Sequence, residues 1–122
     1  MPKVQFVLQN DKQVLLIDFV GISDFGVIPS LIDKAIRLAH SSDSPGSVRT
    51  LIDLSGTRIN KAIMSSLKSL SRSNGRYAKA TAFVGLSKSW SLFLSFLFHA
   101  RGKHNHKVLS SRTEAFRWLE QW

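Results

Sequence analysis

One stretch of the chain, residues 48–70, constrains the fold more than any other, and it reads VRTLIDLSGTRINKAIMSSLKSL. Its first part, Val48 to Leu54, is apolar and rich in β-branched residues, as a buried strand is. A turn at Ser55-Gly56 follows. Beyond the turn, apolar residues recur at helical spacing, namely Ile63, Leu67 and Leu70. An apolar strand that leads into an amphipathic helix is the unit of a parallel α/β sheet, and ligands commonly bind where such strands end.

The other segments extend this pattern over the whole chain. Further strands are expected at Val4 to Leu8, Val14 to Phe19, Lys79 to Leu86 and Lys107 to Leu109. Further helices are expected at about Val27 to Ala39, from Ser87 or Ser89 to about His99, and after a capping box at Ser111 to Glu114. The order is β-β-α-β-α-β-α-β-α. A polar loop at Gln9 to Gln13 suits an antiparallel hairpin, and helical crossovers join the later strands, so we expect one α/β domain over residues 1–122.

Positive charge is concentrated in the second half of the chain. The net charge is +9, and residues 1–57 contain 5 Lys/Arg against 6 Asp/Glu. Residues 58–122 contain 12 Lys/Arg and only two acidic residues, Glu114 and Glu120. Such a field attracts nucleic acid, anionic lipid or an acidic protein. The alternative is a surface that only keeps the protein soluble.

Several classes of protein do not fit this composition. There are no cysteines, which excludes disulfides and thiolate metal sites. The chain opens without a charged-then-apolar leader, and it has no run of about 18 apolar residues. We therefore expect a cytoplasmic protein, with peripheral attachment to a membrane as an open alternative, and we expect no cofactor.

The predicted third helix is unusually apolar. On a helical wheel of about 100° per residue, its apolar side chains cover an arc of roughly 240°, whereas a surface helix needs about 100°. The arc consists of Trp90, Leu92, Phe93, Leu94, Phe96, Leu97 and Phe98. Either part of the arc is exposed to a partner, a lipid or a second copy, or the last helix covers the excess with Trp118 or Trp122. Trp90, Leu92 and Phe96 are our candidates for an exposed apolar surface.

Three histidines, His99, His104 and His106, lie close together in the segment HARGKHNH. Three imidazoles can bind zinc. No carboxylate or cysteine lies near them, and basic residues surround them, so we expect a solvated basic loop and no metal site. The loop also lacks an aromatic pattern for reading bases, which argues against sequence-specific recognition of nucleic acid.

Two carboxylates, Asp18 and Asp53, lie at or near the ends of predicted strands. Paired carboxylates can act as general acid and base. Here no nucleophile, metal motif or glycine-rich phosphate loop accompanies them. We expect Asp53 to cap its turn by accepting hydrogen bonds from backbone N–H groups, and we assign no catalytic residue.

Four short motifs together resemble the SpoIIAA-like proteins of the STAS superfamily (sulfate transporter and anti-sigma factor antagonist domains). They are VLLIDFVGI at 14–22, LIDLSGTRIN at 51–60, FVGLS at 83–87 and TEAFRWL at 113–119. The resemblance spans nearly the whole chain. It implies a STAS-like mixed sheet of about five strands with about four helices, and it implies a regulatory or protein-interaction module that is not an enzyme.

Classical members of that superfamily are switched by phosphorylation of a serine at the start of the helix after LDLSG. Lys61 or Ala62 stands at that place in this chain, so the resemblance is to a divergent branch that lacks the switch. A helix N-terminus with Arg58 and Lys61 beside it favours an anion. Arg58, Asn60 and Lys61 are therefore candidates for contact with an anion or a protein partner.

Two other functions stay open. Some members of the divergent branch resemble the lipid-binding CRAL-TRIO fold, which implies that a lipid or small amphiphile binds beside the third helix. Lys88, Arg101 and Lys103 flank that helix and suit anionic head groups. Non-specific binding of nucleic acid through the basic second half is the other alternative, and it requires an affinity that falls steeply with salt.

Overall fold

The computed structural model describes residues 2–41, 46–74, 77–100 and 105–122. Within them, a five-stranded mixed sheet has the order β1-β2-β3-β4-β5, with β1 antiparallel to β2 and the other pairs parallel. The strands are β1 (Lys3–Gln9), β2 (Lys12–Asp18), β3 (Val48–Asp53), β4 (Ala78–Val84) and β5 (His106–Leu109). The helices are α1 (Ile28–His40), α2 (Lys61–Asn74), α3 (Lys88–Ala100) and α4 (Arg112–Leu119). The predicted fold class and element order are confirmed.

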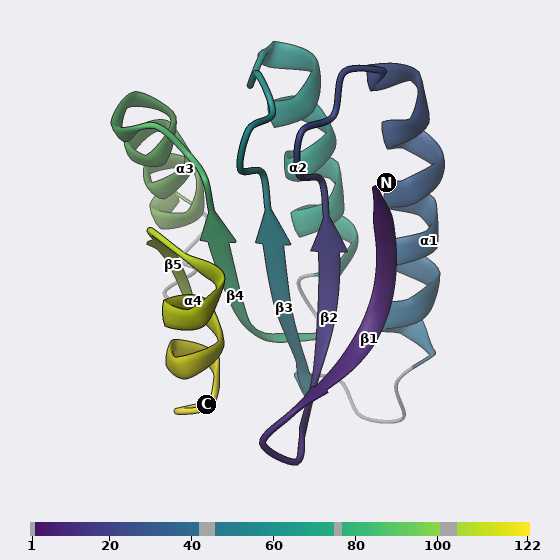
Figure 1. Cartoon of the computed structure of the whole chain (residues 1–122), viewed down its shortest axis with the longest axis vertical. Helices are drawn as coiled ribbons and strands as arrows, with labels where there is room; N and C mark the ends of the chain where they lie inside the picture. The colour runs from purple at the N-terminus through teal and green to yellow at the C-terminus, as the bar shows by residue number, and fades with distance from the viewer. Residues whose placement is uncertain (1, 42–45, 75–76, 101–104) are drawn as a thin grey trace.

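The two faces of the sheet have separate hydrophobic cores. Of the described helices, α1, α2 and α3 pack on one face, and α4 packs on the other (Figure 1). On the α4 face, Ala115 and Leu119 meet Ala80 and Ala82 of β4. Because alanine side chains are small, they let the helix approach the sheet closely. Among the described residues, no helix has the length and apolar character needed to cross a membrane.

The hairpin between β1 and β2 is tighter than predicted. The strands pair from Lys3 with Asp18 down to Gln9 with Lys12, which leaves only Asn10 and Asp11 in the turn. Both turn residues have positive φ angles, 50° and 65°. Asn and Asp tolerate that conformation, and two such residues form the turn whose twist matches paired strands. The predicted loop of Gln9 to Gln13 is therefore wrong in length.

Helix starts follow the local sequence, with two differences from the prediction. A 3-10 turn at Phe25–Val27 precedes α1, so the α-helix begins at Ile28. At α4, Ser111 Oγ accepts a hydrogen bond from Glu114 N at 3.2 Å, as a capping box requires. The Glu114 carboxylate, however, accepts bonds from Ser110 rather than from Ser111. Gly75 and Gly102 are of the residue type that commonly ends a helix, and both lie outside the described residues.

Gly85 holds the end of β4 against the turn after β3. Its φ angle is +89°, and a Cβ atom placed there would lie 2.4 Å from the backbone nitrogen of Ser55. Only glycine fits so close an approach in this left-handed conformation. Leu54 N also donates to Val84 O at 2.8 Å. The carboxyl ends of β3 and β4 are therefore held together beside the first turn of α4.

Candidate functional site

Two carboxylates lie side by side where parallel strands end. Asp18 is the last residue of β2, Asp53 is the last residue of β3, and the register pairs them. Asp53 Oδ1 accepts a hydrogen bond from Ser55 N at 3.0 Å, and Asp18 Oδ1 accepts one from Val20 N at 3.1 Å. The predicted capping role of Asp53 is confirmed, and Asp18 has the same role at its own strand end.

Arg112, the first residue of α4, binds both carboxylates. Its Nε donates to Asp53 Oδ2 at 2.6 Å, and its second contact is an ion pair with Asp18 Oδ2 at 3.0 Å. The side chain of Asp53 is 6% exposed and that of Asp18 is 16% exposed. Charge-assisted hydrogen bonds of this kind are the strong ones. The sequence reasoning missed Arg112, although two acids at adjacent strand ends are a signal that a cation must lie nearby.

The surroundings of Asp53 lower its pKa despite burial. Burial of its carboxyl group opposes ionisation, but hydrogen bonds from Ser55 and pairing with Arg112 outweigh burial and lower the pKa of Asp53 below its ordinary 3.8. Burial also opposes the charge of Arg112, and its bonds to Asp53 and Asp18 raise the pKa of the guanidinium. Since a general acid or base needs a pKa near the working pH, about 7, this cluster fits a structural role.

The start of α2 has one side chain that caps the helix and two basic side chains that are exposed to solvent. Asn60 Oδ1 accepts a hydrogen bond from Ile63 N at 2.9 Å, and Asn60 O accepts one from Met64 N at 3.1 Å. Asn60 is therefore the N-cap of α2, which is a role that the sequence reasoning did not assign. Lys61 and Arg58 are exposed on either side of it.

A groove of about 460 Å³ lies between α2 and α3. We call it the α2–α3 groove, and it is lined by Lys61, Met64, Ser65, Lys68, Trp90 and Phe93. Trp90 and Phe93 meet edge to face, with their ring centroids 5.9 Å apart. The groove thus brings together Lys61 and Trp90, which the sequence placed in two separate candidate surfaces. Phe93 was part of the predicted apolar arc but not among its surface candidates.

The outer side of α3 carries the other two apolar candidates. Leu92 is 65% exposed and Phe96 is 71% exposed, whereas Leu94 on the inner side is 2% exposed. Trp118 of α4 packs into the core of the opposite sheet face. The alternative prediction, in which the last helix covers the apolar arc, is therefore wrong for the described side chains. The side chains of Leu97 and Phe98 lie outside the described residues.

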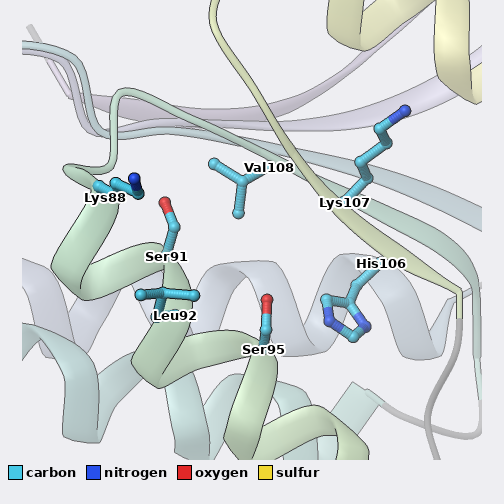
Figure 2. Close-up of a pocket in the computed structure, with 7 residues that line it drawn as sticks. All are labelled: Lys88, Ser91, Leu92, Ser95, His106, Lys107 and Val108. Atoms are coloured by element: carbon cyan, nitrogen blue, oxygen red, sulfur yellow. The ribbon is translucent and has the colours of Figure 1, made fainter.

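A second groove, of about 390 Å³, lies between α3 and the edge strand β5 (Figure 2). We call it the α3–β5 groove, and it is lined by Lys88, Ser91, Leu92, Ser95, His106, Lys107 and Val108. Of the three predicted neighbouring histidines, the side chain of His99 and all of His104 lie outside the described residues. Among the residues that are described, no cluster of His, Asp or Glu could hold a metal ion.

Comparison with known proteins identifies the fold. No protein-family model and no curated protein matches the chain. An uncharacterised DUF3478-family protein from Shewanella loihica PV-4, described as having a SpoIIAA-like fold, has a TM-score of 0.73 at 14% identity, over 98% of this chain and 95% of that one. An anti-sigma-factor antagonist (STAS) domain protein from Planctomyces limnophilus has a TM-score of 0.62 at 11% identity, over 97% and 98%. The chain therefore has the SpoIIAA-like fold shared with STAS domains, as its motifs predicted.

Proposed function

We propose that residues 1–122 form one cytoplasmic domain that binds a protein partner and catalyses no reaction. The observation that carries this proposal is the α2–α3 groove, in which the apolar side chains of Met64, Trp90 and Phe93 lie beside two lysines. Both lysines, Lys61 and Lys68, are exposed, and the lining residues that the structure describes include no acidic residue. Such a surface suits an amphipathic, acidic segment that inserts an apolar side chain between carboxylates.

The role is regulatory, but without a serine switch at the start of α2. The STAS-domain neighbour is described as an anti-sigma-factor antagonist, which supports regulation through a protein partner. Lys61 and Ala62 have no hydroxyl group to accept a phosphate. Arg58 and Lys61 instead add fixed positive charge at the helix N-terminus, which favours an anionic partner.

A labelled peptide tests the groove directly. The probe is a helical peptide of about 16 residues with glutamates on one face and leucines on the other. It is compared with a scrambled peptide of the same composition. Lys68→Glu is expected to weaken binding about tenfold or more, because it reverses one charge of the groove. Lys34→Glu is the matched variant, since Lys34 is exposed on α1 and lines neither groove. Equal losses in both variants, or equal binding of the scrambled peptide, contradict the proposal.

A small amphiphile is the second candidate ligand. The volume of the α2–α3 groove, about 460 Å³, falls within the range of small-molecule sites. An acyl chain would lie along Trp90 and Phe93, with its anionic head near Lys61. Native mass spectrometry after mild purification separates the candidates, because a bound acyl species that competes with the peptide favours the amphiphile.

Two further outcomes have their own signatures. Non-specific binding of nucleic acid by the basic second half predicts affinity for any duplex that falls steeply with salt. Self-association through Leu92 and Phe96 predicts a dimer by light scattering that Phe96→Glu converts to a folded monomer. In either case the α2–α3 groove is not the main working surface.

A further inference from the structure

The outer edge of the sheet at β5 has the geometry to accept another strand. β5 is the last strand in the sheet order and pairs only with β4 within the described chain. Thr81 N donates to Asn105 O at 2.9 Å, and Thr81 pairs with His106 in the register. Along a parallel strand, the backbone N–H and C=O groups of successive residues point alternately to one neighbouring strand and to the other side. The backbone groups of Lys107 and Leu109 therefore point toward β4, whereas those of Val108 point outward.

The α3–β5 groove runs beside this edge. Figure 2 shows Val108 and the ring of His106 on the side of β5 that faces α3, opposite Ser91 and Ser95, while Lys107 points away from the helix. Leu92 contributes an exposed apolar side chain from α3. A strand added next to β5 would point alternate side chains into this groove. Recognition by strand addition combines such backbone bonds with a side-chain groove beside a helix.

The charges of the groove select the kind of strand. Lys88 and Lys107 are both exposed and belong to the lining of the groove, and none of its described lining residues is Asp or Glu. An acidic segment is therefore attracted. A second copy of this chain, paired through the same edge, would bring the same two lysines against the first pair, and like charges at an interface disfavour that pairing.

We propose that the α3–β5 groove is a docking site for an extended, acidic peptide segment, which adds as a strand beside β5. Its apolar side chains contact Val108 and Leu92, and its carboxylates, on the other face of the added strand, contact Lys107, whose side chain points away from α3. This site is separate from the α2–α3 groove, because the two grooves are lined by different residues of α3, Ser91 and Leu92 here and Trp90 and Phe93 there. Either site can therefore fail without the other.

The first test is a titration with a fluorescein-labelled peptide of about nine residues in which valine and glutamate alternate, as side chains do along a strand. A peptide of the same length with proline at alternate positions cannot pair and serves as the matched probe. Lys107→Glu is expected to weaken binding of the first peptide about tenfold or more, because the glutamates of that peptide lie on the face of the strand to which Lys107 points, and Lys34→Glu is expected to change it less than about twofold. Equal losses in the two variants would mean attraction by net charge alone and would overturn the proposal.

The second test reports on the backbone itself. Val108→Pro removes the outward N–H group while leaving the bonds to β4 in place, so a folded Val108→Pro variant is expected to lose binding of the valine–glutamate peptide. In the wild type, a saturating amount of that peptide is expected to slow hydrogen exchange of the Val108 amide about tenfold or more. If the variant does not fold, the exchange measurement decides. Absence of peptide binding, or binding that leaves this exchange rate unchanged, overturns the proposal.

Discussion

Arg112 joins the first turn of α4 to the end of β3, because its Nε donates to the Asp53 carboxylate at 2.6 Å. The same guanidinium pairs with Asp18 at the end of β2. One side chain thus fixes α4, the only helix on its sheet face within the described residues, against two neighbouring strands. The cluster occupies the strand ends where α/β folds commonly bind ligands, and this chain fills that place with structural contacts.

Replacement of Arg112 should therefore destabilise the fold. Arg112→Met leaves the carboxylate of Asp53, which is 6% exposed, without its cation. We expect a loss of about 1–3 kcal/mol in the free energy of unfolding, less than for a fully buried pair because the side chain of Arg112 is 36% exposed. Urea unfolding measures the loss. Arg117→Met, at an exposed position on the same helix, should change stability by less than about 0.5 kcal/mol; equal effects would contradict the assignment.

The lowered pKa of Asp53 also predicts acid sensitivity. A carboxyl group whose pKa is lower in the folded state stabilises the protein above its unfolded pKa, and that contribution is lost as the pH falls through the folded pKa. The loss therefore begins near the ordinary value of 3.8 and continues below it. The free energy of unfolding, measured from pH 6 down, should fall less steeply below about pH 4 in Asp53→Asn than in the wild type. Identical slopes would show that Asp53 makes no such contribution.

Gly85 should tolerate no side chain. In Gly85→Ala the new Cβ would lie 2.4 Å from Ser55 N, at a φ angle of +89°. We expect a loss of about 2–4 kcal/mol in stability. Gly21→Ala is the matched variant, since Gly21 has a φ angle of +62° with no atom within 4 Å of a Cβ, and the conformational cost there is about 1 kcal/mol. Denaturant unfolding of the two variants should rank them in this order.

Asn60 should stabilise α2 as its N-cap and should not contact the partner directly. Asn60→Ala removes the side-chain acceptor for Ile63 N and should cost about 1 kcal/mol. Asn60→Ser keeps a capping hydroxyl and should retain both the stability and the affinity for the acidic helical peptide. If Asn60→Ser is stable but loses that affinity, the amide itself contacts the partner, and its assignment as a cap is incomplete.

The sequence predicted the strands and helices well because their signals are local. Spacing along Ile63, Leu67 and Leu70 is sufficient to place α2, and all three residues are buried. The contact between Arg112 and Asp53 joins residues 59 positions apart and depends on how α4 crosses the sheet. The spacing of apolar residues along the sequence therefore does not predict this contact.

The same limit applies to the grooves. The apolar arc of α3 was visible in the sequence, but which of its residues face α2 depends on the packing of the two helices. That packing places Phe93 beside Lys61 and Lys68, and it leaves Phe96 outside both grooves. The short hairpin turn was also missed, although Asn10-Asp11 is a pair that favours positive φ angles.

The measurement that tests the central claim most directly compares Phe93→Ser with Phe96→Ser. Both phenylalanines are exposed on α3, by 47% and 71%, and only Phe93 lines the α2–α3 groove. Titration with the acidic helical peptide should show affinity reduced about tenfold by Phe93→Ser and unchanged by Phe96→Ser. Unfolding curves confirm that both variants are folded. Equal affinities for the two variants, or a loss confined to Phe96→Ser, would contradict the claim that this groove binds the partner.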